Sequence, residues 1–178
     1  MGGPCEHGGF GSVSVSGKVA YKTYLKKEIS HEFLIEVSAL RSIAHLNVVR
    51  ALDAKLVEGV PVLLLEAFDC SLHRMRHHDA QRCIHTIARQ LTLGLAHVHD
   101  CGFIHRDVKP TNALVRRATS TRPHVVLCDF NSATIARSGR TMTTGPTTFP
   151  YAAPELLLNS DAYGVEVDAW SLGVTLLE

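Results

Sequence analysis

The hydrophobic pattern of this chain changes from a strand period to a helix period near Phe68. Before that residue, short runs rich in valine, leucine and tyrosine predict strands, with turns at Ser16-Gly17 and Glu58-Gly59. After it, apolar residues recur every three or four positions for about four turns, which predicts a helix. The residues of that stripe are Ile84, Ile87, Ala88, Leu91, Leu95 and Val98. Strands followed by helices predict an α+β fold of two lobes with a cleft at their boundary.

Gly102 is expected to end the helix that carries the stripe from Ile84 to Val98. Two further segments also have helical patterns. One segment has an apolar stripe at helical spacing and begins with Ser30 as the expected N-cap. Its stripe residues are Phe33, Val37, Leu40 and Ala44. The other segment, Val167 to Glu178, is apolar on nearly every side, and a helix of this kind is normally buried all round.

The overall composition excludes several classes of partner. The net charge is +1 and the basic pair Arg116-Arg117 is expected to be solvated, so we expect no nucleic-acid partner. No apolar run approaches the ~18 residues that span a bilayer, and no signal peptide opens the chain, so we expect no membrane partner. Five cysteines without a CxxC spacing favour a reducing intracellular compartment, cytoplasmic or nuclear. His73, His77 and His78 could share one turn, but no Cys/Asp/Glu constellation joins them to predict a metal site.

Two features in the first quarter of the chain indicate phosphate chemistry. The stretch GGFGSV, residues 8–13, lies between strands, and its glycines would let backbone N–H groups approach a phosphate. A flexible hairpin loop is the alternative. Lys22, in VAYK, lies on a predicted strand with apolar neighbours, so an inward-facing ammonium group would need a counter-charge. Glu36, on the following helix, is the candidate, and two unrelated surface residues are the alternative.

The segment HRDVKPTN, residues 105–112, carries the side chains that phosphoryl transfer requires. Asp107 can accept a hydroxyl proton, and Lys109 can steady a phosphate. Asn112 can ligate a metal ion, and Asp129, at the end of a buried strand in LCDFN, can hold Mg²⁺ between phosphates. The alternatives are a solvated turn for the first segment and an ordinary helix cap or turn acid for Asp129.

In order, spacing and identity these pieces resemble the eukaryotic protein kinase family, over about Glu6 to Glu178. The matching motifs are FGSV, VAYK, HLNVV nine residues after Glu36, HRDVKPTNALV, CDF, TTFPYAAPE and DAWSLGV. The resemblance implies a small β-rich N-lobe over residues 1–68, with its first strand largely missing, and an incomplete, mainly helical C-lobe over residues 69–178. Together the lobes would form one protein kinase domain.

The resemblance also implies roles for the site residues, with ATP and Mg²⁺ as cofactors and a protein as substrate. Lys22 would hold the α- and β-phosphates of ATP and pair with Glu36. Asp107 would accept the proton of the substrate hydroxyl, and Lys109 would neutralise the γ-phosphate during transfer. The metal ligands would be Asn112 and Asp129.

A second set of residues would bind the rest of the ATP molecule. These residues are Gly8 and Gly11 in the glycine-rich loop, Val13, Ala20 and Leu114 around the adenine, and Glu66 and Phe68 in the hinge, with Leu65 lining the back pocket. His105 and Asp168 would be buried and would brace the catalytic loop without reacting.

Lys109 after Asp107, with Thr148 in the substrate-binding segment, resembles the serine/threonine branch of the family. At the position of Thr111, other members of the family often have an acidic residue that binds an arginine of the substrate. A preference for basic substrates is therefore not expected. Arg106 precedes the catalytic aspartate, as in kinases that are switched by phosphorylation of the activation loop. The candidate acceptors are Ser138, Thr141, Thr143 and Thr144.

Three departures from the family pattern support an alternative, a non-catalytic kinase-like binding module or an inactive truncated fragment. Glu6 replaces the first glycine of the loop, and Asn131 replaces a glycine at a position that can need positive φ. The sequence also stops at Glu178, before the remaining helices of the family. A partner or a missing C-terminal segment would then have to cover the last helix. The side chains expected to lose cover are Trp170, Leu172, Val174, Leu176 and Leu177.

Overall fold

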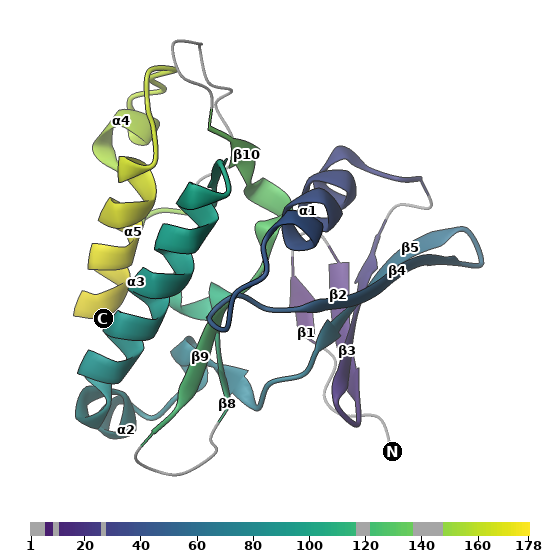
Figure 1. Ribbon diagram of the computed structural model, residues 1–178, viewed down its shortest axis with the longest axis horizontal. Coiled ribbons are helices and arrows are strands. Elements are labelled where there is room, and N and C mark those ends of the chain that lie inside the picture. The colour runs from purple at the N-terminus through teal and green to yellow at the C-terminus, as the bar shows by residue number, and fades with distance from the viewer. Residues whose placement is uncertain (1–5, 9–10, 26–27, 117–121, 137–147) are drawn as a thin grey trace.

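The computed structural model describes residues 6–8, 11–25, 28–116, 122–136 and 148–178 of the 178-residue chain. Within these residues an antiparallel sheet with one helix forms the first lobe, and a mainly helical second lobe follows (Figure 1). The predicted two-lobed α+β fold is therefore confirmed. No described helix is long and apolar enough to cross a membrane.

The first lobe is built on a five-stranded antiparallel sheet in the order β1-β2-β3-β5-β4. Its strands are β1 (Glu6–Gly8), β2 (Gly11–Ser16), β3 (Val19–Tyr24), β4 (Ala51–Val57) and β5 (Val60–Glu66). The predicted hairpin turn at Glu58-Gly59 is present, and both residues have positive φ, 51° and 81°. A turn with positive φ at both central residues matches the right-handed twist of the strands that it joins.

Helix α1 (His31–Ser42) begins where the sequence predicts, with the Ser30 side chain accepting a hydrogen bond from the Phe33 backbone N–H at 3.3 Å. Its buried face differs from the predicted stripe. Glu36 lies on that face and is fully buried, whereas Val37 is only half-buried and Ala44 lies exposed beyond the helix end. A carboxylate takes an apolar position here because it has a buried cationic partner.

The second lobe contains the other helices and two small sheets, β10-β7 and β6-β8-β9. Its helices are α2 (His77–Arg82), α3 (Ile84–Asp100), α4 (Pro154–Leu157) and α5 (Glu166–Leu177), with 3₁₀ turns η1 (Leu72–Arg74), η2 (Pro110–Asn112) and η3 (Phe130–Ser132). Its strands are β6 (Cys70–Ser71), β7 (Phe103–Ile104), β8 (Ala113–Arg116), β9 (His124–Leu127) and β10 (Thr134–Ile135). The predicted stop of α3 is confirmed, since Gly102 follows it with a φ of 78°.

Helix α5 is not buried all round, contrary to the expectation from its apolar pattern. It packs beside α3 (Figure 1), and Leu172 on the packed side is only 8% exposed. Trp170 and Leu177 are 50% and 89% exposed. Of the five apolar side chains expected to be uncovered, Trp170 and Leu177 are exposed, Val174 and Leu176 are half-buried, and Leu172 is buried, so the expectation is wrong for Leu172.

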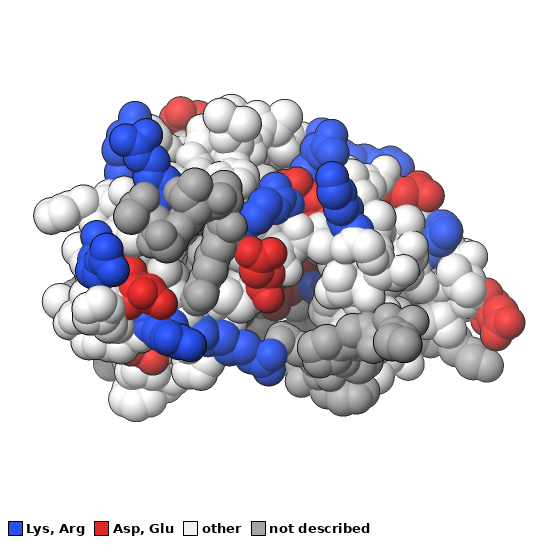
Figure 2. All heavy atoms as spheres, turned by 90° about the horizontal axis from the view of Figure 1, so that it is seen from below, with Lys and Arg blue, Asp and Glu red and all other residues white. Residues whose placement is uncertain are grey.

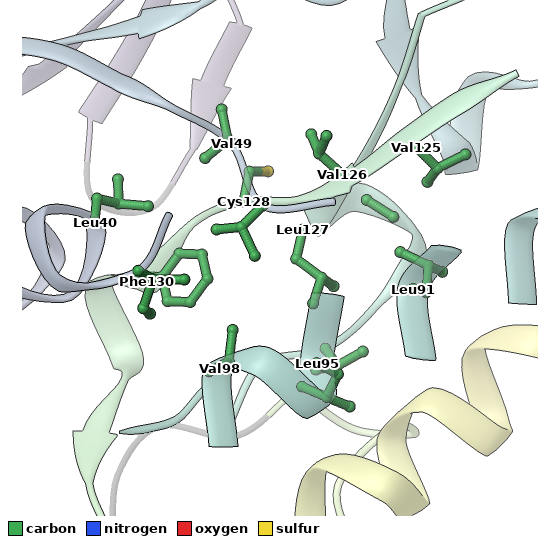
Figure 3. Close-up of a cluster of buried hydrophobic side chains, with 14 of the residues drawn as sticks. Leu40, Val49, Leu91, Leu95, Val98, Val125, Val126, Leu127, Cys128 and Phe130 are labelled. Atoms are coloured by element: carbon green, nitrogen blue, oxygen red, sulfur yellow. The ribbon is translucent and has the colours of Figure 1, made fainter. Parts of the chain in front are cut away.

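A continuous apolar core joins the two lobes. Leu40 and Val49 come from the first lobe and Leu95, Leu127 and Phe130 from the second, and they belong to one buried cluster (Figure 3). The backbone is joined at the same place, because the Val49 N–H donates to the Leu127 carbonyl oxygen at 2.8 Å. The segment after α1 is thus attached to β9, which leads directly to Asp129.

Candidate active site

The segment 105–112 forms a loop between β7 and β8 and is held by a side chain of α5. The Asp168 carboxylate accepts the backbone N–H groups of His105 at 2.7 Å and of Arg106 at 2.8 Å. The His105 ring lies within hydrogen-bond distance of the Cys128 carbonyl oxygen, with Nε2 at 2.9 Å. His105 and Asp168 are both fully buried, as the bracing role predicted for them requires.

The carboxylate of Asp107 is surrounded by three polar side chains. The Asn112 amide nitrogen donates to its Oδ2 at 2.9 Å, and the Lys109 ammonium nitrogen lies 2.8 Å from the same oxygen. The Thr148 hydroxyl donates to Oδ1 at 2.7 Å and accepts from Lys109 at 2.8 Å. The structure thus brings together four of the predicted residues, from the loop and from the segment near Ala153.

A second charged cluster lies between the lobes. The Lys22 ammonium nitrogen lies 2.5 Å from an oxygen of Glu36 and 2.5 Å from an oxygen of Asp129. Burial alone would lower the pKa of Lys22, but the two carboxylates outweigh burial and hold that pKa well above its usual value. Burial acts in the opposite sense on Glu36 and raises its pKa. The predicted counter-charge of Lys22 is therefore present, and a second carboxylate joins it.

The backbone around Asp129 corrects one expectation. Asp129 itself has a φ of 65°, in the left-handed region, and so does Arg106. Asn131, at a position that can need positive φ, does not have it here: it lies inside the 3₁₀ turn η3 and is buried. Because η3 begins directly after Asp129, the left-handed residue is the one that precedes the turn.

Strand packing requires a glycine in this loop, independently of any bound phosphate. Gly8 on β1 pairs with Gly11 on β2. A Cβ atom at Gly11 would lie 2.1 Å from the Thr23 carbonyl oxygen, so close approach of the strands alone excludes a side chain there. Glu6 lies on β1 opposite Val13, and its side chain lies outside the described part of the structure.

The side chains predicted to contact adenine, the hinge and the back pocket come from four strands, β2, β3, β5 and β8, and from the hinge. Ala20 and Leu65 face each other across β3 and β5 and are buried. Val13, Leu114 and Phe68 are half-buried and pack against the same core. All five side chains therefore belong to, or pack against, the core cluster that spans the two lobes.

Two residues beside the site were missed from the sequence. Arg116, expected to be solvated, donates to the Ala67 carbonyl oxygen at 2.7 Å, and its guanidinium carbon lies 4.2 Å from the Phe68 ring centroid. Tyr24 is buried, and its hydroxyl donates to Glu36. The alternation of side chains along a strand could have predicted that Tyr24 lies near Lys22, because residues two apart point to the same face.

Arg106 is already engaged by groups of the second lobe. Its Nε donates to the Ser132 carbonyl oxygen at 2.7 Å and its Nη1 to the Tyr163 hydroxyl at 3.1 Å. The phosphorylation candidates that would pair with it lie outside the described residues and stay predictions. These are Ser138, Thr141, Thr143 and Thr144.

The oxygen atoms near Lys22 and Asp107 suit a magnesium ion. Asn112 uses its amide nitrogen for Asp107, which leaves the oxygen, the metal-binding atom of an amide, outside that contact. Among the described residues no three His, Cys, Asp or Glu side chains form a group that could hold a metal ion. Mg²⁺ in phosphate-binding sites needs only one or two protein carboxylates besides phosphate and water oxygens, so Asp129 with Asn112 fits it.

The face of the molecule seen from below (Figure 2) carries charges of both signs. On the face shown in Figure 2, acidic and basic side chains are interspersed among uncharged ones. The three histidines His73, His77 and His78 are all exposed.

Comparisons with known proteins agree on one family. The family model for the protein kinase domain matches residues 7–178. A probable CTD kinase subunit alpha homolog of Encephalitozoon cuniculi is 31% identical over 180 residues, which is 96% of this chain and 54% of that protein. The cell division control protein 2 homolog 2 of Trypanosoma brucei brucei is 38% identical over 148 residues, 80% of this chain and 42% of that protein.

A third relative is the serine/threonine-protein kinase chk-1 of Caenorhabditis briggsae. It is 35% identical over 161 residues, which is 84% of this chain and 31% of that protein. The chain thus spans about a third to a half of the length of these curated relatives.

Proposed function

The chain belongs to the protein kinase family, and on that premise we propose that it is an ATP-dependent protein serine/threonine kinase. It transfers the γ-phosphate of ATP to a serine or threonine hydroxyl of a protein substrate. The observation that carries this proposal is the setting of Asp107, whose carboxylate is held by Asn112 and Thr148 with the Lys109 ammonium group 2.8 Å away.

Asp107 is the residue that receives the substrate proton. As the hydroxyl oxygen forms its bond to the γ-phosphorus atom, the bond from that phosphorus to the β–γ bridging oxygen breaks, and the hydroxyl proton passes to Asp107. Lys109 offsets the negative charge on the transferring phosphoryl group. Asn112 holds the Asp107 carboxylate in one orientation through its 2.9 Å hydrogen bond, which aims the base at the hydroxyl.

The nucleotide is assigned to the junction of the lobes. Lys22, held by Glu36, binds the α- and β-phosphates, and Asn112 and Asp129 would hold Mg²⁺. When bound, Mg²⁺ neutralises phosphate charge. The remaining ATP-binding residues are Gly8, Gly11, Val13, Ala20, Glu66, Phe68 and Leu114. In this proposal residues 1–68 form the lobe that covers the nucleotide, and residues 69–178 form the lobe that binds the protein substrate.

The serine/threonine preference is supported by Thr148 and by a relative. The Thr148 hydroxyl bridges Asp107 and Lys109, so the segment before Ala153 approaches the base closely enough to favour a short hydroxyl side chain. The Caenorhabditis briggsae relative, 35% identical, is named a serine/threonine-protein kinase. Phosphorylation of the segment 138–144, with Arg106 as the partner of the new phosphate, is the proposed means of activation.

Transfer of radiolabelled phosphate from ATP to a generic protein substrate tests the proposal. We expect incorporation on serine and threonine, reduced about 10²- to 10⁴-fold by Asp107→Asn. Asp161→Asn is the matched control, because Asp161 is an exposed aspartate. Equal activity of Asp107→Asn and wild type would contradict the proposal. Stabilisation by Mg-ATP without any transfer would favour the non-catalytic module.

A further inference from the structure

The Tyr24 hydroxyl contacts the same carboxylate oxygen as the site lysine. Tyr24 follows Lys22 by two residues on β3, so both side chains lie on one face of the strand, and Tyr24 is only 4% exposed. Its hydroxyl donates to Oε2 of Glu36, the oxygen that also accepts from Lys22 at 2.5 Å. Burial, followed by the Glu36 charge, raises the pKa of the Tyr24 phenol, so the group remains a hydrogen-bond donor.

The Tyr24 ring contacts α1 at a second point. It packs edge-on against Phe33, with ring centroids 5.1 Å apart and planes at 83°. Phe33 and Glu36 are three residues apart and therefore share one face of α1. The Lys22 ammonium nitrogen lies 5.4 Å from the Tyr24 ring centroid, within reach of a cation–π contact. Tyr24 thus fixes the helix to the sheet through its ring and through its hydroxyl.

The orientation of the Glu36 carboxylate depends on the two donors to its Oε2, Lys22 and Tyr24. Its other oxygen, Oε1, is buried and has no hydrogen-bond partner among the described residues. Of the two donors to Oε2, Lys22 is shared with Asp129 at the same 2.5 Å distance. A phosphate that draws Lys22 away would weaken one of the two contacts. The Tyr24 contact involves no ligand-binding group and would stay.

We propose that Tyr24 is a positioning residue for nucleotide binding, whose hydroxyl keeps the Glu36 carboxylate in place beside Lys22 while Lys22 engages phosphate. The inference rests on the proposed function, because it assigns Lys22 to ATP. It adds to the Lys22–Glu36 pair a third member, which comes from the same strand as the lysine.

The first test compares two tyrosine variants of β3. Tyr24→Phe keeps the ring and removes the hydroxyl, and Tyr21→Phe makes the same change on the other face of the strand. Affinity for Mg-ATP is measured by calorimetry between about pH 5.5 and 8. We expect Tyr24→Phe to bind about tenfold more weakly at neutral pH, with the acid limb of its pH profile about one unit higher, because a carboxylate that loses a donor ionises less readily. Tyr21→Phe should match wild type.

A double-mutant comparison separates this role from general packing. In Glu36→Gln the carboxylate is absent, so adding Tyr24→Phe should change Mg-ATP affinity less than twofold. If Tyr24→Phe weakens binding by the same factor with or without Glu36, or leaves the pH profile of wild type unchanged, the proposal is overturned.

A measurement without nucleotide distinguishes failure of this inference from failure of the proposed function. The Glu36 carboxyl carbon is titrated by NMR, with its signal assigned by its loss in Glu36→Gln. A higher titration midpoint in Tyr24→Phe than in wild type supports the coupling, and an equal midpoint overturns it. If Tyr24→Phe does not fold, 3-fluorotyrosine at position 24, a stronger donor, should lower the midpoint, and no change overturns the proposal. Wild type that binds no Mg-ATP would refute the proposed function alone.

Discussion

The Asp168 carboxylate holds the backbone of Arg106 from a position 62 residues further along the chain, with its Oδ1 accepting the Arg106 N–H at 2.8 Å. Its Oδ2 accepts the His105 N–H and lies 2.8 Å from the His99 ring nitrogen. Arg106 has a φ of 65°, a conformation that costs a non-glycine residue roughly 1–3 kcal/mol. The buried carboxylate therefore stabilises the strained backbone that presents Asp107.

Asp168→Asn should destabilise the fold, because an amide nitrogen cannot accept one of the two backbone N–H groups. Leaving a buried donor without its acceptor costs about 1–3 kcal/mol, so we expect a loss of about 2 kcal/mol in the free energy of unfolding in urea. Asp161→Asn, at an exposed aspartate, is the control and should stay within about 0.5 kcal/mol of wild type. Equal midpoints for the two variants would show that Asp168 does not brace the loop.

Two helical glycines should respond oppositely to alanine. A Cβ atom at Gly94 on α3 would lie 2.5 Å from the Asn47 carbonyl oxygen, whereas one at Gly173 on α5 would meet nothing within 4 Å. We expect Gly94→Ala to lose about 2 kcal/mol of stability by overpacking, and Gly173→Ala to gain up to about 1 kcal/mol from helix propensity. Urea unfolding of both variants measures this, and a neutral Gly94→Ala would mean that Asn47 moves away freely.

Lys22→Met should lower the free energy of unfolding, and by more at neutral pH than at acid pH. The variant leaves Glu36 buried without its counter-charge, a loss of about 3–5 kcal/mol at neutral pH. Burial then raises the folded-state pKa of Glu36 further above its unfolded value of about 4.3, so stability falls as pH rises through that folded pKa. Urea unfolding should therefore show a deficit that shrinks on acidification.

The control for this prediction is Lys55→Met, at an exposed lysine on β4. Because Lys55 is surrounded by solvent, the change should leave stability and its pH dependence close to those of wild type. A Lys22→Met deficit that is constant over the whole pH range would show that the variant acts through packing and not through the charge of Glu36.

Local patterns predicted the parts of the fold that depend on neighbouring residues. Ser30 caps α1 through a bond to Phe33, and the turn at Glu58 needs only its own backbone geometry. The contacts of Arg116 and Tyr24 involve Ala67 and Glu36, which are 49 and 12 residues away in the chain. Strand alternation puts Tyr24 on the face of Lys22, but no local pattern predicts the contacts themselves. The same reason explains why an inward-facing role was expected for Lys22 but its contact with Asp129 was not.

The apolar pattern of α5 shows the other limit of sequence reasoning. A count of apolar residues predicted burial on all sides, yet the side chains of Trp170 and Leu177 are 50% and 89% exposed. Which side of a helix is covered depends on the elements packed against it, here α3 beside Leu172. The part of the candidate site around Asp107 was more predictable, because the motif HRDVKPTN carries Asp107, Lys109 and Asn112 within one loop.

Thr148 links the structure most directly to the proposed catalysis. Its hydroxyl donates to Asp107 at 2.7 Å and accepts from Lys109 at 2.8 Å, so it fixes the proposed base and the ammonium group of Lys109 relative to each other. Thr148→Val keeps the volume and removes the hydroxyl. Because hydrogen bonds to charged groups contribute about 1.5–3 kcal/mol, we expect a fall of about 10- to 100-fold in kcat for phosphate transfer, with the KM for ATP nearly unchanged.

Thr148→Ser is the matched control for this prediction, since it restores the hydroxyl and removes only a methyl group. Phosphate transfer should return to within about threefold of wild type, because the side chain can again accept from Lys109 and donate to Asp107. If Thr148→Ser were as impaired as Thr148→Val, the methyl group and not the hydroxyl would be the essential part, and Thr148 would act by packing. If both variants kept full kcat, the contact with Asp107 would have no catalytic consequence.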